Sequence, residues 1–503
     1  MKRFFSFLLV LLMLLPVFTA FGCGKKKAQE TKVIRVCNCD DYIDMDLIDE
    51  FEAETGIDVV YSTFSTNENL YNELVINPNS YDLVVPSEYM IQKLAVEGKI
   101  NKLDHSKIAG YDQNVSSYIS NRLKSIEFTV ESGDLRGEHV SLDDFMVGYM
   151  WGTMGWVYNT EHVSDADVKN WYSPFNNQNL SDKITIKDSV RDSYLVGLAM
   201  VYKEELYKAK DNAEITQILN RVGQEDIDKV GEILSQIKPM LYGFEVDSGK
   251  NDIVLGNIDA YIAWSGDAAY AIDVASGKVE DEDGTILDPS KQKRLSYNIP
   301  EEGSNIWFDG FVMPSGSQNY DVVYKFLEFI SRPEVAYRNM DYIGYTSMIA
   351  NGEFDLDGEP TTIFDSFVYD KYDQSATLSS NEGKWVDLSY FFGTDREYKV
   401  FVSNEEYGRL IAQYPDAQIV ERCAVMSYFD GNTLLDVNEM WEKVKGETFP
   451  IWLLILFASI ILLLAVFMIL YRNRDKIRWF KLPERKRYYA ERKGLKVVKK
   501  ENL

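Results

Sequence analysis

Few residues of this 503-residue chain have the types and spacing that covalent catalysis or metal binding requires. Residues 37–39 read Cys-Asn-Cys, which has metal-like chemistry, but the chain holds only three histidines and none is nearby. Residues 355–358 read Asp-Leu-Asp-Gly and resemble part of a calcium loop without its full spacing. We find neither a phosphate-cradling glycine loop nor a nucleophile elbow. We therefore expect no enzyme, no metal and no cofactor.

A carboxylate among aromatic side chains is the strongest candidate for binding chemistry. Asp309 stands between Trp307, Phe308 and Phe311, where an unpaired charge is costly. A purely structural role for this aspartate is the alternative.

Strand and helix patterns alternate in the part of the chain that must position such side chains. We predict strands over 33–36, 57–62 and 81–85. Helices are predicted over 46–55, closed by Gly56, and over 67–75. This alternation indicates a parallel sheet, whose ligands bind beyond the carboxyl ends of its strands. We therefore expect a site at the loops that follow the three strands, 38–42, 63–66 and 86–89.

An apolar run without any charge lies near the C-terminus, from residue 451 to 470. It is long enough to cross a bilayer, with Trp452, Tyr471 and Trp479 as interfacial aromatics and a basic segment after it. We predict a transmembrane helix over 451–470, an extracellular or periplasmic domain before it and a cytoplasmic basic tail over 471–503. A buried globular helix is the alternative.

The N-terminus carries a secretory pattern. Lys2 and Arg3 precede an apolar run and then small residues, so we predict a signal peptide over 1–22. The sequence Ala-Phe-Gly-Cys at 20–23 resembles the lipobox of bacterial lipoproteins, which makes Cys23 a predicted lipidation site. A plain small-residue cleavage site is the alternative. Together the two predicted anchors place the protein at the cell membrane.

The formal net charge is −26, although residues 472–503 are basic, so the outer domain is the more acidic part. Nucleic acid and anionic substrates are poor partners for such a domain. The acidic field attracts cations, or it serves solubility alone. Beyond Cys23 only Cys37, Cys39 and Cys423 remain, too few for a disulfide scaffold. The length between the predicted anchors favours two lobes.

Several motifs in a shared order resemble a known family. They include NCDDYID, FEAETGIDVVYSTFSTNENLY, SYDLVVPSEYMIQKL, IKDSVRD, AYIAWSGDAAY, NIWFDGFVMP and YIGYTS. From residue 33 to about 351, and weakly from 414, the chain is similar to the spermidine/putrescine-binding protein of polyamine ABC importers. The resemblance implies an α/β, two-lobed periplasmic-binding-protein-like (type II) fold with hinge strands over 31–448. It places one lobe at about 31–148 and 309–345, and the other at about 149–308 and 346–448.

The resemblance also implies a ligand site. A polyamine needs carboxylates for its ammonium groups and aromatic faces for its methylenes. Carried over by motif, the aromatic walls are Tyr42, Trp264, Trp307 and Tyr345; the polar contacts are Ser87 and Tyr89; and the ammonium partners are Asp192 and Asp309, with Asp267 as a further candidate. Each has a plainer alternative: the aromatics as core, Ser87 and Tyr89 as turn residues, and Asp192 as the cap of the helix that follows it.

The chain departs from the family in three places, one of them near Met426, where the family has a glutamine. Cys39 stands where the family usually has tryptophan, followed by Asp40, and residues 352–413 have no recognised counterpart. The predicted function is a membrane-anchored substrate-binding component of an ABC importer. It would capture an extracellular polyamine and deliver it to a permease whose ATPase is on another chain. A polyamine-sensing or other cationic-solute receptor is the alternative, although the tail is too short to be a signalling domain.

Overall fold

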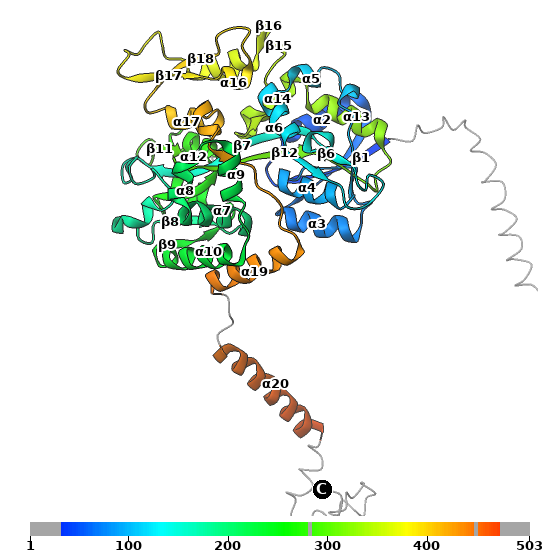
Figure 1. Ribbon diagram of the computed structural model, residues 1–503, viewed down its shortest axis with the longest axis vertical. Coiled ribbons are helices and arrows are strands. Elements are labelled where there is room, and N and C mark those ends of the chain that lie inside the picture. The colour runs from blue at the N-terminus through cyan, green and yellow to red at the C-terminus, as the bar shows by residue number, and fades with distance from the viewer. Residues whose placement is uncertain (1–31, 280–283, 447–450, 473–503) are drawn as a thin grey trace, which may run out of the picture. The chain divides into compact units, whose positions relative to one another are not determined.

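Two β-sheets organise the chain in the computed structural model, which describes residues 32–279, 284–446 and 451–472 (Figure 1). We call the part built on the smaller sheet the first lobe and the part built on the larger sheet the second lobe. The predicted signal peptide (1–22), the predicted lipidation site Cys23 and residues 473–503 of the predicted tail lie outside the described residues.

The sheet of the first lobe is parallel, which confirms the prediction. Its strands lie in the order β2 (Ile57–Phe64), β1 (Lys32–Cys39) and β3 (Leu83–Val84). The helices α2 (Met45–Thr55) and α3 (Asn67–Ile76) extend the predicted ranges by one residue each. Gly56 adopts a φ of 66° and donates its backbone N–H to Glu52 O, so it ends α2 as predicted. β3 is shorter than the predicted strand over 81–85.

Residues far apart in sequence complete the first lobe. Phe51 on the buried face of α2 packs edge-on against Phe326 and Phe329, with ring centroids 5.1 and 5.5 Å apart. The other helices of this lobe are α4 (Glu88–Val96), α5 (Tyr111–Asn114), α6 (Ser117–Ser125), α13 (Tyr320–Ile330) and α14 (Pro333–Ile343). The small pairs β4 (Ile100–Asn101) with β13 (Met313–Pro314), and β5 (Glu127–Thr129) with β6 (His139–Ser141), border it.

The second lobe is built on a mixed sheet of eight strands. Its main order is β19 (Cys423–Ala424), β12 (Ser304–Phe311), β7 (Val147–Asn159), β10 (Ala260–Trp264), β8 (Ile184–Lys187) and β9 (Leu241–Glu245). β11 (Leu295–Asn298) and β14 (Thr346–Ser347) also pair with β7. Its helices are α7 (Val190–Val201), α8 (Lys203–Lys208), α9 (Asn212–Leu219), α10 (Gln224–Ile237), α11 (Gly249–Leu255) and α12 (Ser265–Ala275).

Two strands connect the lobes. All of β7 is buried, and it pairs antiparallel with β12 from Ile306 opposite Thr153 to Phe311 opposite Val147. Just beyond this ladder, Val312 forms a bridge with Val84 of the first lobe. The observed crossing agrees with the predicted hinge strands, while the residue boundaries proposed for the lobes stay predictions.

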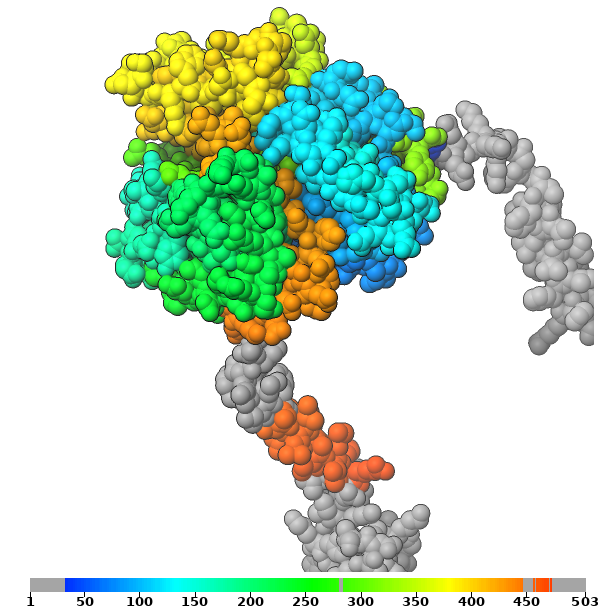
Figure 2. All heavy atoms as spheres, viewed as in Figure 1, coloured from blue at the N-terminus to red at the C-terminus, as the bar shows by residue number. Residues whose placement is uncertain are grey.

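A third segment, residues 423–429, runs between the lobes. Met426 O accepts a hydrogen bond from Gln92 of α4 at 3.2 Å, and Ser427 O accepts one from Arg191 of α7 at 3.1 Å. In Figure 2 atoms of this orange region separate the green and cyan parts of the molecule. The segment therefore contacts both lobes.

The region without a family counterpart forms an insertion of its own. It comprises the hairpins β15 (Glu353–Leu356)–β16 (Glu359–Thr362) and β17 (Gly383–Asp387)–β18 (Lys399–Ser403), with α15 (Asp370–Tyr372), α16 (Ser389–Phe392) and α17 (Tyr407–Gln413); α18 (Ala417–Val420) follows it. Asp355 Oδ1 accepts a hydrogen bond from Gly358 N at 2.8 Å, so the calcium-like motif forms the turn of the first hairpin.

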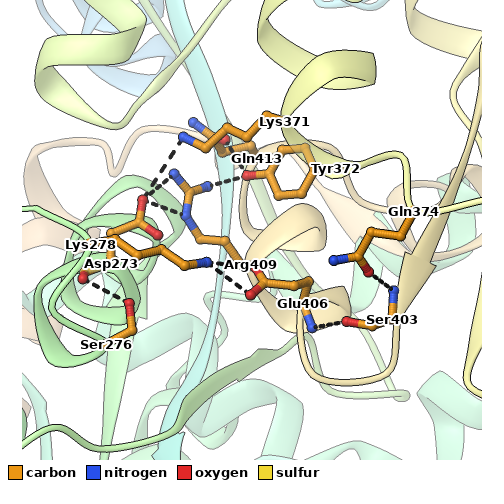
Figure 3. Close-up of polar contacts among 10 residues, drawn as sticks. All are labelled: Asp273, Ser276, Lys278, Lys371, Tyr372, Gln374, Ser403, Glu406, Arg409 and Gln413. Carbon is orange, nitrogen blue, oxygen red and sulfur yellow. Dashed lines mark hydrogen bonds and ion pairs between the residues drawn. The ribbon is translucent and has the colours of Figure 1, made fainter. Parts of the chain in front are cut away.

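The insertion is attached to both lobes. Arg409 donates from Nε and Nη2 to Asp273 Oδ2 of α12, at 2.9 and 2.7 Å (Figure 3). Toward the first lobe, Gln413 donates to the carbonyl of Gly344 at the end of α14, at 3.1 Å, and Ser116 Oγ donates to Phe391 O at 2.7 Å. A charged attachment therefore faces the second lobe, and a neutral one faces the first.

The chain from Glu439 onward forms a second compact unit. The helix α19 (Gly431–Lys445) leads into it, and α20 (Ile451–Arg472) covers the segment predicted to span a membrane. In the described part of the chain, no helix is both long and apolar enough to cross a membrane. The side chains of residues 451–455, 457 and 470 lie outside that part. The helix is thus confirmed, whereas the transmembrane prediction is not.

Candidate functional site

Asp309 lies where β12 meets the first lobe. The ladder with β7 shifts register between Asp309 and Gly310, and Asp309 itself forms a bridge with Ser87 after β3. The carboxylate is 8% exposed; its Oδ2 accepts a hydrogen bond from Tyr42 OH at 2.8 Å, whereas Oδ1 has no hydrogen-bond partner among the described residues. Burial raises the pKa of Asp309 to about 6, and Ser87 and Tyr42 offset part of that rise.

Three of the four predicted aromatic walls meet beside Asp309. The rings of Tyr42 and Tyr345 pack edge to face with centroids 4.9 Å apart, and Trp307 lies 5.8 Å from Tyr345. Each ring belongs to a different segment: the loop after β1, the loop before β14, and β12. The structure therefore joins residues that the sequence separates by up to some three hundred positions, and the aromatic walls are shared by both lobes.

Ser87 and Tyr89 follow β3 at its carboxyl end, as predicted. Ser87 N donates to Asn67 Oδ1 at 3.0 Å and its Oγ accepts from Asn67 Nδ2 at 3.1 Å, so the loops after β2 and β3 are tied together. The Ser87 hydroxyl makes no cap bond to α4, although Ser87 is its N-cap residue. Tyr89 OH donates to Glu68 Oε1 at 3.1 Å.

Asp192 lies in the first turn of α7 and is 6% exposed. Only one half of a capping box is formed: Ser189 Oγ accepts from Asp192 N at 3.4 Å, which makes Ser189 the cap. Burial raises the pKa of Asp192, against the lowering influence of Ser189 and Lys187. The capping role proposed as the alternative therefore falls to Ser189, and the Asp192 carboxyl faces Trp264, whose hydrogen bond also acts to lower its pKa.

Sequence reasoning missed Glu68, which belongs to the same acidic group. Burial raises the pKa of Glu68, and the charge of Asp192 across the lobes adds to the rise. Asp192 also adds to the rise at Asp309. No lysine, arginine or histidine within the described ranges lies within ion-pair distance of any of these three carboxylates, although the charges of Lys187 and Arg191 act on Asp192 from further away and lower its pKa. The signal for Glu68 was its place two residues past the end of the loop predicted after β2, 63–66.

Trp264 ends β10, and Asp267 lies in the first turn of α12. Tyr345 OH donates to Asp267 Oδ1 at 2.7 Å, so one tyrosine contacts Asp267 while its ring touches Tyr42. Lys187, which sequence reasoning also missed, places its ammonium 4.1 Å from the centre of the Trp264 ring and 3.7 Å from Asp267 Oδ2. The IKDSVRD motif contained this lysine, but nothing in the motif indicated that its side chain lies against Trp264 and Asp267.

Cys39 is a free thiol, as are Cys37 and Cys423. Burial raises the pKa of Cys39 well above its usual value, and the charge of Asp309 adds to the rise. Cys39 therefore lies near Asp309, where the family resemblance placed a missing tryptophan. A disulfide between Cys39 and Cys37 or Cys423 is not formed.

The geometry fits an organic cation rather than a metal ion. Carboxylates without a cationic partner, flanked by aromatic rings, bind ammonium groups through charge-assisted hydrogen bonds and cation–π contacts. Among the residues that the structure describes, no group of three metal-ligating side chains is arranged to hold a metal. Such an arrangement is chemically suited to a ligand that combines positive charge with an apolar chain.

Known proteins resemble this chain over most of its length. It is 29% identical over 350 residues to the putrescine-binding periplasmic protein SpuD of Pseudomonas aeruginosa, covering 69% of this chain and 84% of the relative. It is 28% identical over 333 residues to the putrescine-binding periplasmic protein PotF of Escherichia coli, covering 64% and 79%. These relatives are binding proteins and not enzymes, as predicted for this chain.

The structure resembles the spermidine/putrescine ABC transporter substrate-binding protein PotD of Streptococcus pneumoniae. The TM-score is 0.54 at 23% identity, over 82% of this chain and 99% of that one, which supports the two-lobed periplasmic-binding-protein fold. The family model for bacterial extracellular solute-binding proteins matches residues 46–355. Because this match covers more than half of the chain, the protein belongs to the bacterial extracellular solute-binding protein family.

Proposed function

We propose that the protein is the solute-binding component of a polyamine ABC importer and binds an amine of the spermidine/putrescine class between its lobes. The observation that carries the proposal is Asp309, a buried carboxylate that, among the described residues, has one oxygen without a hydrogen-bond partner and no cation within ion-pair distance. An arriving ammonium would supply the missing hydrogen bond and the missing charge. The putrescine-binding relatives support the choice of ligand class.

The nine predicted residues would make three kinds of contact with the ligand. Asp309 and Asp192 would hold an ammonium, Tyr42, Trp307 and Tyr345 would line the methylene chain, and the remaining four, Ser87, Tyr89, Trp264 and Asp267, would border the two ends. Because Asp309 belongs to a crossing strand and Asp192 to the second lobe, a ligand held by both would stabilise the closed lobes. The closed form would then deliver the amine to a permease whose ATPase is a separate chain.

Membrane attachment is the second part of the proposal, and the evidence for it comes from the sequence. Acylation of Cys23 and insertion of residues 451–470 would hold the binding domain outside the cell, with the basic tail in the cytoplasm. Labelled fatty acid should enter the parent protein and not Cys23→Ala, while both remain in the membrane fraction. An unlabelled parent would remove lipidation from the proposal.

Isothermal titration calorimetry of the full-length protein in detergent tests the ligand. We expect binding of putrescine or spermidine and none of magnesium, a dication without methylenes. Binding of magnesium with equal affinity would indicate a general cation site. Absence of heat with every amine would overturn the proposed function.

A further inference from the structure

Lys187 is an unusual lysine because its charged end is buried inside the proposed site. It ends β8, is 1% exposed, and donates from Nζ to Val246 O at 2.7 Å. Its ammonium also lies 3.4 Å from Glu245 Oε1 and 3.7 Å from Asp267 Oδ2. The ring centre of Trp264 is 4.1 Å away. A buried ammonium requires such partners, and Lys187 has two carboxylates, a carbonyl and an aromatic face.

These partners are the ones that a ligand ammonium would seek. Trp264 and Asp267 stand among the residues proposed to bind the amine, yet both already contact an ammonium that belongs to the chain. Asp309 and Asp192, by contrast, have no lysine, arginine or histidine within ion-pair distance among the described residues, although the charges of Lys187 and Arg191 reach Asp192 from further away. The carboxylates of the site therefore differ in whether an ammonium of the chain itself is in direct contact with them.

We infer that Lys187 is a specificity-determining residue that takes the place of one ligand ammonium, so that the site recognises a single ammonium group, at Asp309 and Asp192. The inference rests on the proposed function and refines its ligand. A second ammonium at the far end of a diamine gains no contact with Trp264 or Asp267 while Lys187 stays in place.

Displacement of the Lys187 ammonium by a ligand would not lower the free energy of the complex. Withdrawing its ammonium would leave Glu245 and Asp267 buried without it, and removing one member of a buried ion pair is strongly unfavourable. A ligand ammonium would restore contacts of the same kind and number that Lys187 had lost. The exchange therefore yields no net gain, and Lys187 would still need a new place for its charge.

Pairs of amines that differ only at the far end test the inference. Putrescine and cadaverine each carry two ammonium groups, whereas butylamine and pentylamine have the same carbon chains with one. By calorimetry on the full-length protein in detergent, we expect the parent to bind each diamine within about tenfold of its matched monoamine. Lys187→Met frees Trp264 and Asp267, so we expect at least tenfold tighter binding of a diamine, with monoamine affinity changed less than threefold.

Lys183→Met is the matched control. Lys183 immediately precedes β8, and its Nζ likewise donates to a backbone carbonyl, Asn257 O at 2.9 Å, but it lies at the opposite end of the strand. We expect its diamine preference to equal that of the parent. Lys187→Met leaves the carboxylates of Glu245 and Asp267 together, which could lower the melting temperature. In that case the double variant Lys187→Met, Glu245→Gln, which keeps Asp267 as the single carboxylate, takes the place of the single variant in the assay.

The outcomes separate the two levels of the proposal. A parent that prefers diamines strongly, together with a folded Lys187 variant whose preference is unchanged or lower, would overturn the inference and leave amine binding intact. Failure of the parent and the variants to bind every amine would overturn the proposed function, and the inference with it.

Discussion

Two aspartates of nearly equal burial have opposite electrostatic surroundings. Asp273 on α12 is 6% exposed and Asp309 on β12 is 8% exposed. Burial acts to raise the pKa of Asp273, but the Arg409 guanidinium outweighs it and the pKa falls below its usual value. No cation of the described residues lies within ion-pair distance of Asp309, and burial raises its pKa to about 6. Burial alone therefore does not tell a structural carboxylate from a binding one.

Asp273 and Asp309 differ in the partner that the rest of the chain provides for each carboxylate. The insertion brings Arg409 to Asp273 and closes a structural ion pair, whereas the chain supplies Asp309 with a tyrosine hydroxyl and leaves one oxygen unpaired. Asp267 is a third case, since it lies inside the site and yet already has Lys187 beside it. A carboxylate that lacks an internal cation is the one positioned to take a cation from solution.

The largest effect should come from breaking the structural pair. Arg409→Met leaves Asp273 buried without its main cation, and we expect the free energy of unfolding to fall by about 3–5 kcal/mol. Urea denaturation of the full-length protein measures it. Lys278→Met is the control, because its pair with Glu406 lies in the same cluster but is half exposed, and we expect less than about 1 kcal/mol (Figure 3). Equal losses in both variants would contradict the distinction.

Removing the charge of Asp309 should affect binding instead. Asp309→Asn keeps the shape of the side chain and removes its charge, so we expect at least a roughly 30-fold loss of putrescine affinity, about 2 kcal/mol. The melting temperature of the empty protein at pH 7.5 should not fall, because an unpaired buried carboxylate has been removed. Calorimetry and a thermal melt measure the two quantities.

Asp273→Asn is the mirror-image control for Asp309→Asn. It should lower the melting temperature and leave putrescine affinity unchanged, since the Asp273 carboxylate pairs with Arg409 of the insertion and is not among the residues proposed to bind the ligand. Unchanged affinity in Asp309→Asn would remove Asp309 from the site.

The pH dependence of binding sharpens the comparison. With a pKa of about 6, Asp309 is almost fully ionised at pH 7.5 and mostly protonated at pH 5, whereas a primary amine stays charged throughout. We expect putrescine affinity to fall about tenfold over this range. Asp309→Asn should lose most of the dependence, and any remainder would belong to Asp192 and Glu68, whose pKa values burial also raises. A parent affinity independent of pH would contradict the role given to Asp309.

The effect of the Asp309 charge on the stability of the empty protein should be opposite to its effect on binding: the ionised carboxylate destabilises the fold. A carboxyl group whose pKa is higher in the folded than in the unfolded state destabilises the fold above that pKa and not below the unfolded value. The advantage of Asp309→Asn over the empty parent in melting temperature should therefore shrink as the pH falls through 6.

The smallest effect should come from restoring an aromatic wall. Cys39 is a free thiol near Asp309, so Cys39→Trp would return a ring to the place that the family usually fills with tryptophan. We expect two- to fivefold tighter putrescine binding, or roughly 0.5–1 kcal/mol, the size of a partly exposed cation–π contact. Cys37→Ser, on the same strand, serves as the control with no gain in affinity. Equal affinity of a folded Cys39→Trp and the parent would refute the placement.

Periodicity and turn residues predicted the first lobe well because its strands and helices are adjacent in sequence. Asp309 could be predicted as well, since its aromatic neighbours are its immediate neighbours in the chain. Lys187 and Arg409 could not, because their partners lie 59 and 136 residues away and only the folded chain brings them together. Sequence motifs identified which residues meet in the site, and the distribution of charge within it depended on the tertiary structure.

The strand β7 belongs to the eight-stranded sheet and is also tied to the first lobe, because Gly148 N near its start donates to Tyr111 OH of α5 at 2.8 Å. It pairs with β10 and β11 inside the second lobe and with β12 up to the border of the first, and one continuous set of buried apolar side chains accompanies it. Loss of β7 would open the sheet of the second lobe and break its contacts with the first, so we expect the two lobes to unfold as one cooperative unit although each forms a separate wall of the ligand site. A proteolytic cut within β7 would then inactivate the protein by unfolding it, even if every proposed ligand contact remained in the sequence.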